Sequence, residues 1–190
     1  MKGKILVTGG TGYIGSHTVV ELQNAGYEVV IIDNLSNSSA DVVDNIEKVS
    51  GIRPAFEELD CLDYAGLDAV FTKYKGIKAI IHFAASKAVG ESVQKPLLYY
   101  RNNLVSLINL LELMPKHGVE GIVFSSSCTV YGQPDELPVT ADIAQVVTLV
   151  REEELLDHVA GRSLVGRLRS TQLAIDIHHG FFFGVTRIFL

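Results

Sequence analysis

A glycine-rich turn near the start of the chain constrains the fold more than any other feature of the sequence. An apolar run at residues 5–7 leads into Thr8-Gly9-Gly10-Thr11-Gly12-Tyr13-Ile14-Gly15, and a helical pattern follows. The glycines fit both G-x-G-x-x-G and the variant G-x-x-G-x-x-G. Such glycines make the tight turn, let the backbone approach a pyrophosphate, and let the helix pack closely on the strand. The helix N-terminus then favours phosphate, so Gly9, Gly12 and Gly15 predict a dinucleotide site.

An acidic residue closes the second apolar run. Asp33 follows residues 28–32 and lies 18 residues after Gly15. This is near the spacing of about 20 residues at which a carboxylate binds the adenosine ribose of a dinucleotide. Because a carboxylate in that place would repel a 2′-phosphate, the sequence predicts NAD rather than NADP as the cofactor.

Length and composition limit the classes of function. With 190 residues the chain can bury one sizeable core, and a net charge of -6 without a run of Lys or Arg argues against nucleic-acid binding. Cys61 and Cys128 lack the spacing of a metal site or a disulfide framework, so we expect no metal. Neither a signal peptide nor a membrane span is predicted. We therefore expect a cytoplasmic protein that binds a small molecule and no membrane.

Five apolar runs alternate with helical patterns over the first 125 residues. Strands that alternate with helices form right-handed crossovers and parallel sheets. The sequence therefore predicts an α/β fold, a Rossmann-like doubly wound parallel sheet in a three-layer αβα sandwich, with a truncated C-terminal part. The strands are expected at residues 4–8, 28–33, 55–59, 79–84 and 121–125.

The pattern after the fourth strand predicts a long helix over residues 96–116. One apolar face, expected to pack on the core or in a dimer, comprises Leu104, Leu107, Ile108, Leu111 and Met114, whereas Leu97, Leu98 and Leu110 lie off it.

The character of the sequence changes after Thr140. Residues 141–168 have helical potential, and residues 181–190 have the pattern of a final strand. We expect an NAD-binding Rossmann domain at residues 1–140 and a divergent tail at residues 141–190 that completes or packs on it.

Four stretches of the sequence resemble the UDP-glucose 4-epimerase family of the extended short-chain dehydrogenase/reductase superfamily. The glycine turn is shared across that superfamily, whereas the stretches at residues 33–38 and 87–100 point to the epimerase branch. The resemblance covers residues 1 to about 140, and its motifs are at residues 8–17, 33–38, 87–100 and 125–132.

The resemblance implies roles for individual residues. Five groups of residues would contact the cofactor, and one serine would meet the substrate. Tyr13 and Ile14 would lie against the pyrophosphate, and Asp60 and Cys61 would meet the adenine. Asp33 would hold the adenosine ribose, which would be lined by Asn34, Leu35, Ser36, Asn37 and Ser38. Asn102 would lie near the nicotinamide half, Ser127 would be catalytic and bond the substrate hydroxyl, and the stretch beside the cofactor would comprise Phe83, Ala84, Ala85, Ser86 and Lys87.

The resemblance also implies a reaction in galactose metabolism. UDP-glucose and UDP-galactose would interconvert through transient oxidation at C4 by NAD, with a tyrosinate taking the hydroxyl proton. A UDP-hexose is thus the expected substrate. Any oligomer is expected to form through residues 96–116, as a homodimer.

The chain departs from the family pattern after Ser127. The Tyr-x-x-x-Lys helix that should follow is missing, since no tyrosine comes after Tyr131, and the match at Tyr74 and Lys78 precedes the fourth strand and is a coincidence. We therefore expect the chain to be inactive in this truncated form. The alternatives are a non-catalytic NAD-binding module or another short-chain sugar-nucleotide dehydratase or reductase. His82, inside an apolar strand, is expected to be a hydrogen-bonded core residue.

Overall fold

The computed structural model of the chain describes residues 2–125 and 185–189. The chain divides into two compact units, Met1–Val123 and Phe124–Leu190. In the second unit, strand β6 spans Val185–Phe189, within the range where a final strand is predicted. The predicted helix at residues 141–168 lies outside the described residues, and the division at residue 140 stays a prediction.

A parallel sheet organises the first unit. Its strands follow the spatial order β3-β2-β1-β4-β5, and β1 pairs in parallel with both β2 and β4, while β2 pairs in parallel with β3. This confirms the predicted Rossmann-like fold. The strands are β1 (Lys4–Thr8), β2 (Glu28–Asp33), β3 (Ala55–Glu58), β4 (Ile77–His82) and β5 (Gly121–Ser125), the last of which begins in the first unit and ends in the second.

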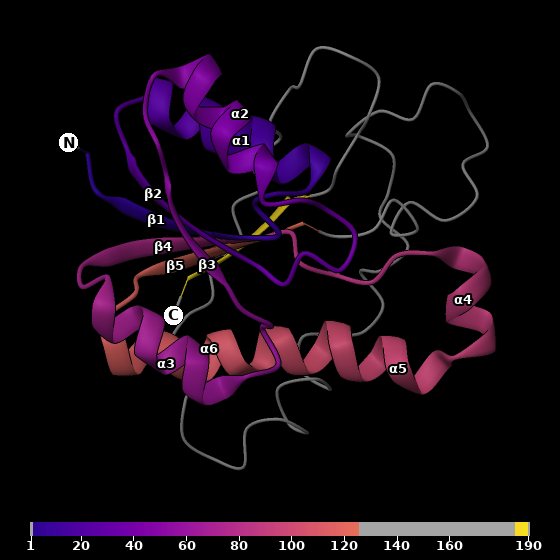
Figure 1. Cartoon of the computed structure of the whole chain (residues 1–190). Helices are drawn as coiled ribbons and strands as arrows, with labels where there is room; N and C mark the ends of the chain where they lie inside the picture. The colour runs from indigo at the N-terminus through magenta and orange to yellow at the C-terminus, as the bar shows by residue number, and fades with distance from the viewer. Residues whose placement is uncertain (1, 126–184, 190) are drawn as a thin grey trace, which may run out of the picture. The chain divides into compact units, whose positions relative to one another are not determined.

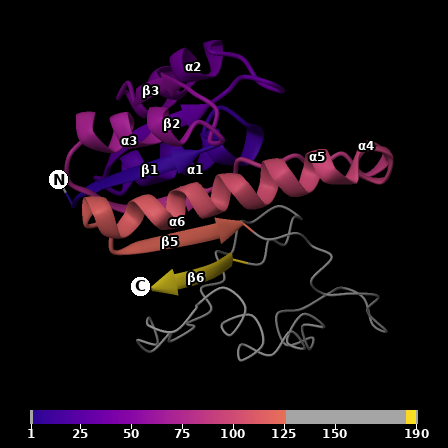
Figure 2. The ribbon, with the colours of Figure 1, turned by 90° about the horizontal axis from the view of Figure 1, so that it is seen from below.

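Helices cover both faces of this sheet, which makes the three layers of the predicted sandwich. Helices α1 (Tyr13–Asn24) and α2 (Asp41–Ser50) lie on one face, and α3 (Tyr64–Lys73) and α6 (Ser106–His117) lie on the other (Figure 1). Figure 2 shows α4, α5 and α6 as successive segments of one run. Between β4 and α6 the chain forms α4 (Val89–Gln94), α5 (Pro96–Tyr100) and the π-helical turn η1 (Arg101–Val105).

The central strands are apolar throughout because both of their faces are covered. Leu6 on β1, Val30 on β2 and Ile80 on β4 lie opposite one another in the register and are all fully buried. Continuous apolar runs are typical of strands in a sheet with helices on both faces. The register also places Thr8 opposite Ile32 and His82, so the carboxyl ends of β1, β2 and β4 lie side by side.

The fourth strand ends earlier than the sequence predicts. It spans Ile77–His82 rather than residues 79–84, because its partner β1 ends at Thr8, which pairs with His82. Phe83 and Ala84 continue the apolar pattern but lie beyond the paired strands. They therefore belong to the loop at the carboxyl edge of the sheet, where ligands bind in folds of this class.

Helix α6 buries only part of the face that the sequence predicts to pack on the core or in a dimer, since Met114 of that face is fully buried. Ile108 is 49% exposed, whereas Leu110 and Leu113 are fully buried. The helix has two apolar faces, and the buried one includes Asn109, whose Nδ2 donates to the carbonyl of Cys61 at 3.0 Å. The predicted face is thus divided between the core and the surface, and its part in a dimer stays a prediction.

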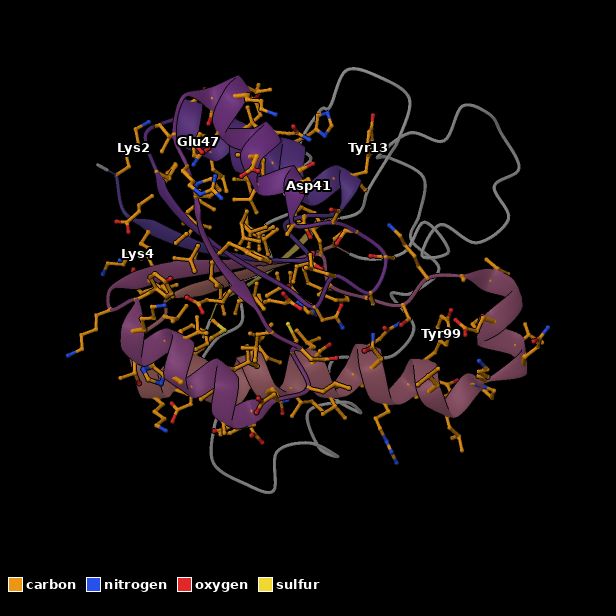
Figure 3. The ribbon with its side chains drawn as sticks, in the orientation of Figure 1. Lys2, Lys4, Tyr13, Asp41, Glu47 and Tyr99 are labelled. Atoms are coloured by element: carbon orange, nitrogen blue, oxygen red, sulfur yellow. The ribbon has the colours of Figure 1, made fainter. Side chains whose placement is uncertain are left out.

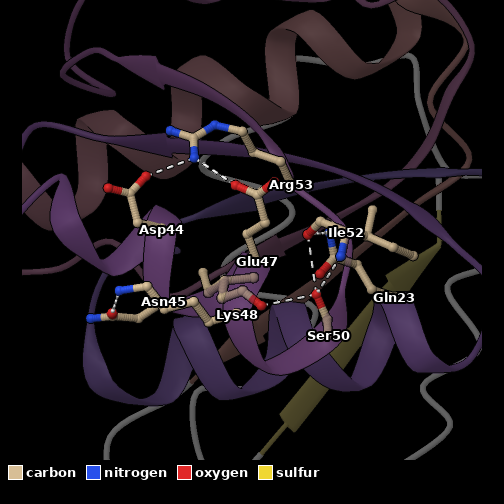
Figure 4. A network of polar contacts seen from close by, with 9 residues as sticks. Gln23, Asp44, Asn45, Glu47, Lys48, Ser50, Ile52 and Arg53 are labelled. Atoms are coloured by element: carbon tan, nitrogen blue, oxygen red, sulfur yellow. Dashed lines mark hydrogen bonds and ion pairs between the residues drawn. The ribbon is translucent and has the colours of Figure 1, made fainter.

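A surface network follows α2 (Figure 4). Arg53 Nη1 donates to Asp44 Oδ1 at 2.6 Å and to Glu47 Oε2 at 2.8 Å, and these two bonds raise the pKa of the Arg53 guanidinium. Nearby, Asn45 Oδ1 accepts from Lys48 Nζ at 3.2 Å. Exposed pairs of this kind contribute little to stability, so α2 offers neutral positions for control substitutions.

Candidate cofactor site

The glycines bring three segments of backbone into close contact. Gly9 has a φ of 70°, and a Cβ there would lie 2.8 Å from the amide nitrogen of Ala84 in the loop after β4. A Cβ at Gly15 would collide with the carbonyl oxygen of Gly9 and lie 2.9 Å from Gly10 Cα. Only glycine therefore allows β1, the β4 loop and the first turn of α1 to approach this closely.

The N-terminus of α1 is built to receive an anion. Gly12 precedes the helix and supplies no side-chain cap, and the first helical bond runs from Ser16 N to Gly12 O at 2.9 Å. The N–H groups of Tyr13, Ile14 and Gly15 thus have no acceptor inside the helix. Tyr13 is 79% exposed, and its side chain points away from the sheet (Figure 3). The amide groups and the helix dipole together favour a phosphate here.

The carboxylate of Asp33 is fixed by the glycine turn and by its own loop. It is buried, its Oδ2 accepts from Thr11 N at 3.1 Å, and its Oδ1 accepts from Leu35 N at 3.0 Å. Ser38 Oγ lies 2.7 Å from Thr11 Oγ1 and also donates to Asp33 Oδ1 at 3.3 Å. Two carboxylate oxygens offer about four acceptor sites, and three are used, so Asp33 Oδ2 can still accept a bond from a ribose hydroxyl.

The loop after β2 is strained and joined to the loop after β3. Leu35 has a φ of 57°, a conformation that costs energy for a residue with a side chain and that concentrates at functional sites. Asn34 Oδ1 accepts from Ser36 N at 3.1 Å, and Asn34 Nδ2 donates to Asp60 Oδ2 at 3.0 Å. These bonds hold the predicted adenosine residues together at one place.

Cys61 is a structural residue in this arrangement. Burial, followed by the charges of Asp60 and Asp33, raises the pKa of its thiol to about 12. The thiol is therefore neutral at pH 7 and is not a nucleophile. Its carbonyl accepts from Asn109, which fixes the backbone beside the predicted adenine site.

His82 is a core residue at the end of β4, as predicted. Its Nδ1 shares a hydrogen bond of 2.6 Å with Thr8 Oγ1, and Phe83 N donates to Thr8 O at 3.0 Å. Burial lowers the pKa of His82 to about 4, so the imidazole is neutral at pH 7. The pair joins the ends of β1 and β4 directly below the glycine turn.

Two asparagines hold the loop after β4. Asn103 Oδ1 accepts from Ser86 N at 2.8 Å and Asn103 Nδ2 donates to Ser86 O at 2.9 Å. Asn102 Nδ2 donates to Ser86 Oγ at 3.0 Å. Ala85 and Lys87 on either side of Ser86 are exposed, so the loop presents one charged side chain and one small one to a ligand.

The predicted cofactor residues therefore gather along the carboxyl edge of the sheet. The glycine turn lies in the centre, with residues 33–38, 60 and 61 on the β2 and β3 side and residues 83–87 with Asn102 on the β4 side. Their individual roles stay predictions. Ser127 lies outside the described residues. Neither Thr11, which lies inside the predicted glycine turn, nor Asn103, which follows Asn102, is given a role by the sequence.

The two residues of the chance Tyr-x-x-x-Lys match, Tyr74 and Lys78, bind different partners in the structure. Tyr74 Oη donates to Glu57 Oε1 at 2.6 Å, whereas Lys78 Nζ pairs with Glu120 Oε1 at 2.7 Å. Burial and Glu57 raise the pKa of Tyr74, the opposite of what a tyrosinate base needs. This pair therefore gives no catalytic base.

A hollow of about 280 Å³ lies at the opposite edge of the sheet, by the start of β4. The C-terminal ends of α3 and α6 carry negative partial charge there, and Lys116 already pairs with Asp68 at 2.6 Å. A phosphate is thus less favoured here than at α1.

Among the described residues no group of His, Cys, Asp or Glu is arranged to hold a metal, and no helix is long and apolar enough to cross a membrane.

Solved structures share this fold. That of UDP-glucose-4-epimerase from Stenotrophomonas maltophila, with bound NAD and formylated UDP-arabinopyranose, has a TM-score of 0.71 and 44% identity, covering 82% of this chain and 48% of that one. UDP-glucose 4-epimerase from Bifidobacterium longum, in complex with NAD+ and UDP, has a TM-score of 0.70 and 47% identity, covering 75% of this chain and 42% of that one.

Relatives found by sequence similarity carry the same name as these solved structures. UDP-glucose 4-epimerase of Bacillus subtilis is 56% identical over 138 residues, which are 73% of this chain and 40% of the relative. The human UDP-glucose 4-epimerase is 54% identical over 144 residues, 73% of this chain and 41% of the relative. The chain thus spans about two fifths of these relatives' length. The profile of the NAD dependent epimerase/dehydratase family matches residues 5–149, and the chain belongs to that family.

Proposed function

We propose that this chain binds NAD along the carboxyl edge of its sheet. The adenosine lies over β2 and β3, the pyrophosphate at the N-terminus of α1, and the nicotinamide half beside the loop after β4. The observation that carries the proposal is the hydrogen bond from Thr11 N to Asp33 Oδ2, because it fixes a carboxylate beside an anion-binding turn at the place of an adenosine ribose. The related solved structures contain NAD, which supports NAD as the ligand.

Asp33→Ala should weaken NAD binding about 10- to 100-fold, because hydrogen bonds to a charged group contribute about 1.5–3 kcal/mol each. The wild-type chain should bind NAD better than NADP, since the carboxylate repels a 2′-phosphate, and the variant should narrow that preference. Calorimetric titration with both cofactors measures it. Asp41→Ala, on the exposed start of α2, is the matched control and should keep the wild-type preference. Equal affinity of the wild type for NAD and NADP would disprove the role given to Asp33.

The parent reaction is the interconversion of UDP-glucose and UDP-galactose, as the relatives' names indicate. This chain by itself is expected to have little or no such activity, because no tyrosine follows Tyr131 to take the C4 hydroxyl proton. General base catalysis contributes about 10² to 10⁴ in rate. The chain would then act as a non-catalytic NAD-binding module.

A coupled assay of UDP-galactose conversion, run beside an NAD titration, tests this expectation. Binding without turnover is the expected outcome. Conversion by the purified chain that Ser127→Ala abolishes would contradict it and would show that another residue serves as the base.

A homodimer in the cytoplasm, acting in galactose metabolism, belongs to the same proposal. The support for self-association is an exposed apolar stripe on α5, η1 and α6, where Leu97 is 80%, Leu104 53% and Ile108 49% exposed. Burying such a stripe against its copy would remove apolar area from water. Light scattering that gives the monomer mass at every concentration would exclude the dimer.

A further inference from the structure

The side chain of Asn103 holds the loop after β4 through the same pair of backbone hydrogen bonds that a neighbouring strand would form. Asn103 Oδ1 accepts from Ser86 N at 2.8 Å while Asn103 Nδ2 donates to Ser86 O at 2.9 Å. Both backbone groups of Ser86 are thereby paired, although the residue lies beyond the end of the sheet. An amide is suited to this because it carries an acceptor and a donor on one planar group.

The π-helical turn makes this contact possible. Asn102 and Asn103 are consecutive residues of η1, yet both reach Ser86, one at its Oγ and the other at its backbone. Consecutive side chains leave a regular α-helix about 100° apart, and the wider i→i+5 turn reduces that angle. Asn103 Oδ1 also accepts from Asn102 Nδ2 at 3.1 Å, which locks the two amides together. Such π turns are rare in proteins, and those that do occur are frequently at functional sites.

The clamped loop begins next to the glycine turn. Ala84 N is the atom that a Cβ at Gly9 would meet at 2.8 Å, and Ser86 follows two residues later on the β4 side. Asp33 lies on the other side of the turn, since β1 separates β2 from β4 in the sheet. A dinucleotide whose adenosine ribose is at Asp33 must therefore extend its other half toward Ser86.

We infer that Asn103 is a positioning residue that holds the β4 loop where the nicotinamide half of NAD binds. The inference rests on the proposed NAD site and deepens it. Within the described residues, Asn103 forms its hydrogen bonds with Ser86, Asn102 and Ser106, none of them on the adenosine side. Its loss should therefore affect NAD without affecting ADP, which lacks the nicotinamide ribose and ring. If removal of the clamp leaves the loop correctly placed about a tenth of the time, the apparent Kd for NAD rises about tenfold.

Titrations of Asn103→Leu with NAD and with ADP test the inference. The expected result is about a tenfold weaker affinity for NAD and an unchanged affinity for ADP. Asn103→Asp keeps the acceptor for Ser86 N and loses the donor to Ser86 O, so it should fall between the wild type and Asn103→Leu. Asn45→Leu, the same replacement on the exposed side of α2, should change neither affinity.

The outcomes separate the inference from the proposal on which it rests. Unchanged NAD affinity in Asn103→Leu, or an equal loss of NAD and ADP, would overturn the positioning role. If Asn103→Leu fails to fold, the same comparison on Asn103→Asp decides. A wild type that binds ADP as tightly as NAD would also overturn the inference while keeping the adenosine site, whereas a wild type that binds neither would overturn the proposed function.

Discussion

Gly15→Ala is expected to lower the free energy of unfolding by about 3 kcal/mol or more and to abolish NAD binding. The added Cβ would collide with the carbonyl oxygen of Gly9 and lie 2.9 Å from Gly10 Cα. Both neighbours are backbone atoms of the turn, so no side chain can move aside, and α1 must shift away from β1. That shift displaces the amide groups meant for the phosphates. Urea unfolding and NAD titration measure the two effects.

Alanine substitutions at two other glycines serve as controls for Gly15→Ala. Gly12→Ala meets only Gly9 O at 3.2 Å, so it should cost little stability while its methyl group obstructs the approach of a pyrophosphate. Gly90→Ala, in α4 with no atom within 4 Å, should be neutral or slightly stabilising, since Ala is the better helix former. A Gly15→Ala variant as stable as the wild type would contradict the close packing described for α1.

Acid is expected to destabilise the chain through His82. The pKa of His82 falls from 6.5 to about 4 on burial, so below pH 6.5 the unfolded chain binds a proton that the folded chain does not. The contribution of His82 is fully present above pH 6.5 and is lost as the pH falls to about 4. At about 1.4 kcal/mol per pKa unit, the total loss is about 3 kcal/mol.

Comparison with a variant isolates that contribution from those of the carboxylates, which titrate in both proteins. His82→Asn cannot ionise, so its unfolding free energy should decline less steeply than that of the wild type between pH 6.5 and pH 4. Urea unfolding at several pH values gives both curves. Parallel curves would show that His82 is not buried in its neutral form.

The parts of the site that sequence analysis located are those carried by local pattern. The glycines of the turn and Asp33 stand in a strand, turn and helix whose order alone determines their positions, and the structure brings them to one edge of the sheet. The continuous apolar runs likewise predicted the parallel sheet, because a strand covered on both faces has no polar alternation.

The parts that were missed depend on contacts between distant segments. Thr11 holds Asp33 through its backbone N–H, a group that every non-proline residue possesses, so its type gave no signal. Asn103 and Asn109 bond to backbone carbonyls 17 and 48 residues away. Nothing in the local pattern distinguishes such asparagines from solvent-exposed ones, so the buried face of α6 was predicted only in part.

The central claim is that the phosphates of NAD bind at the N-terminus of α1. Backbone amide chemical shifts, followed by NMR during titration with NAD, test it most directly because they report each N–H separately. The account predicts saturable shifts at Tyr13, Ile14 and Gly15, with none at Lys116 beside the hollow at the opposite edge. Shifts confined to that hollow, or no saturable shifts at the glycine turn, would contradict it.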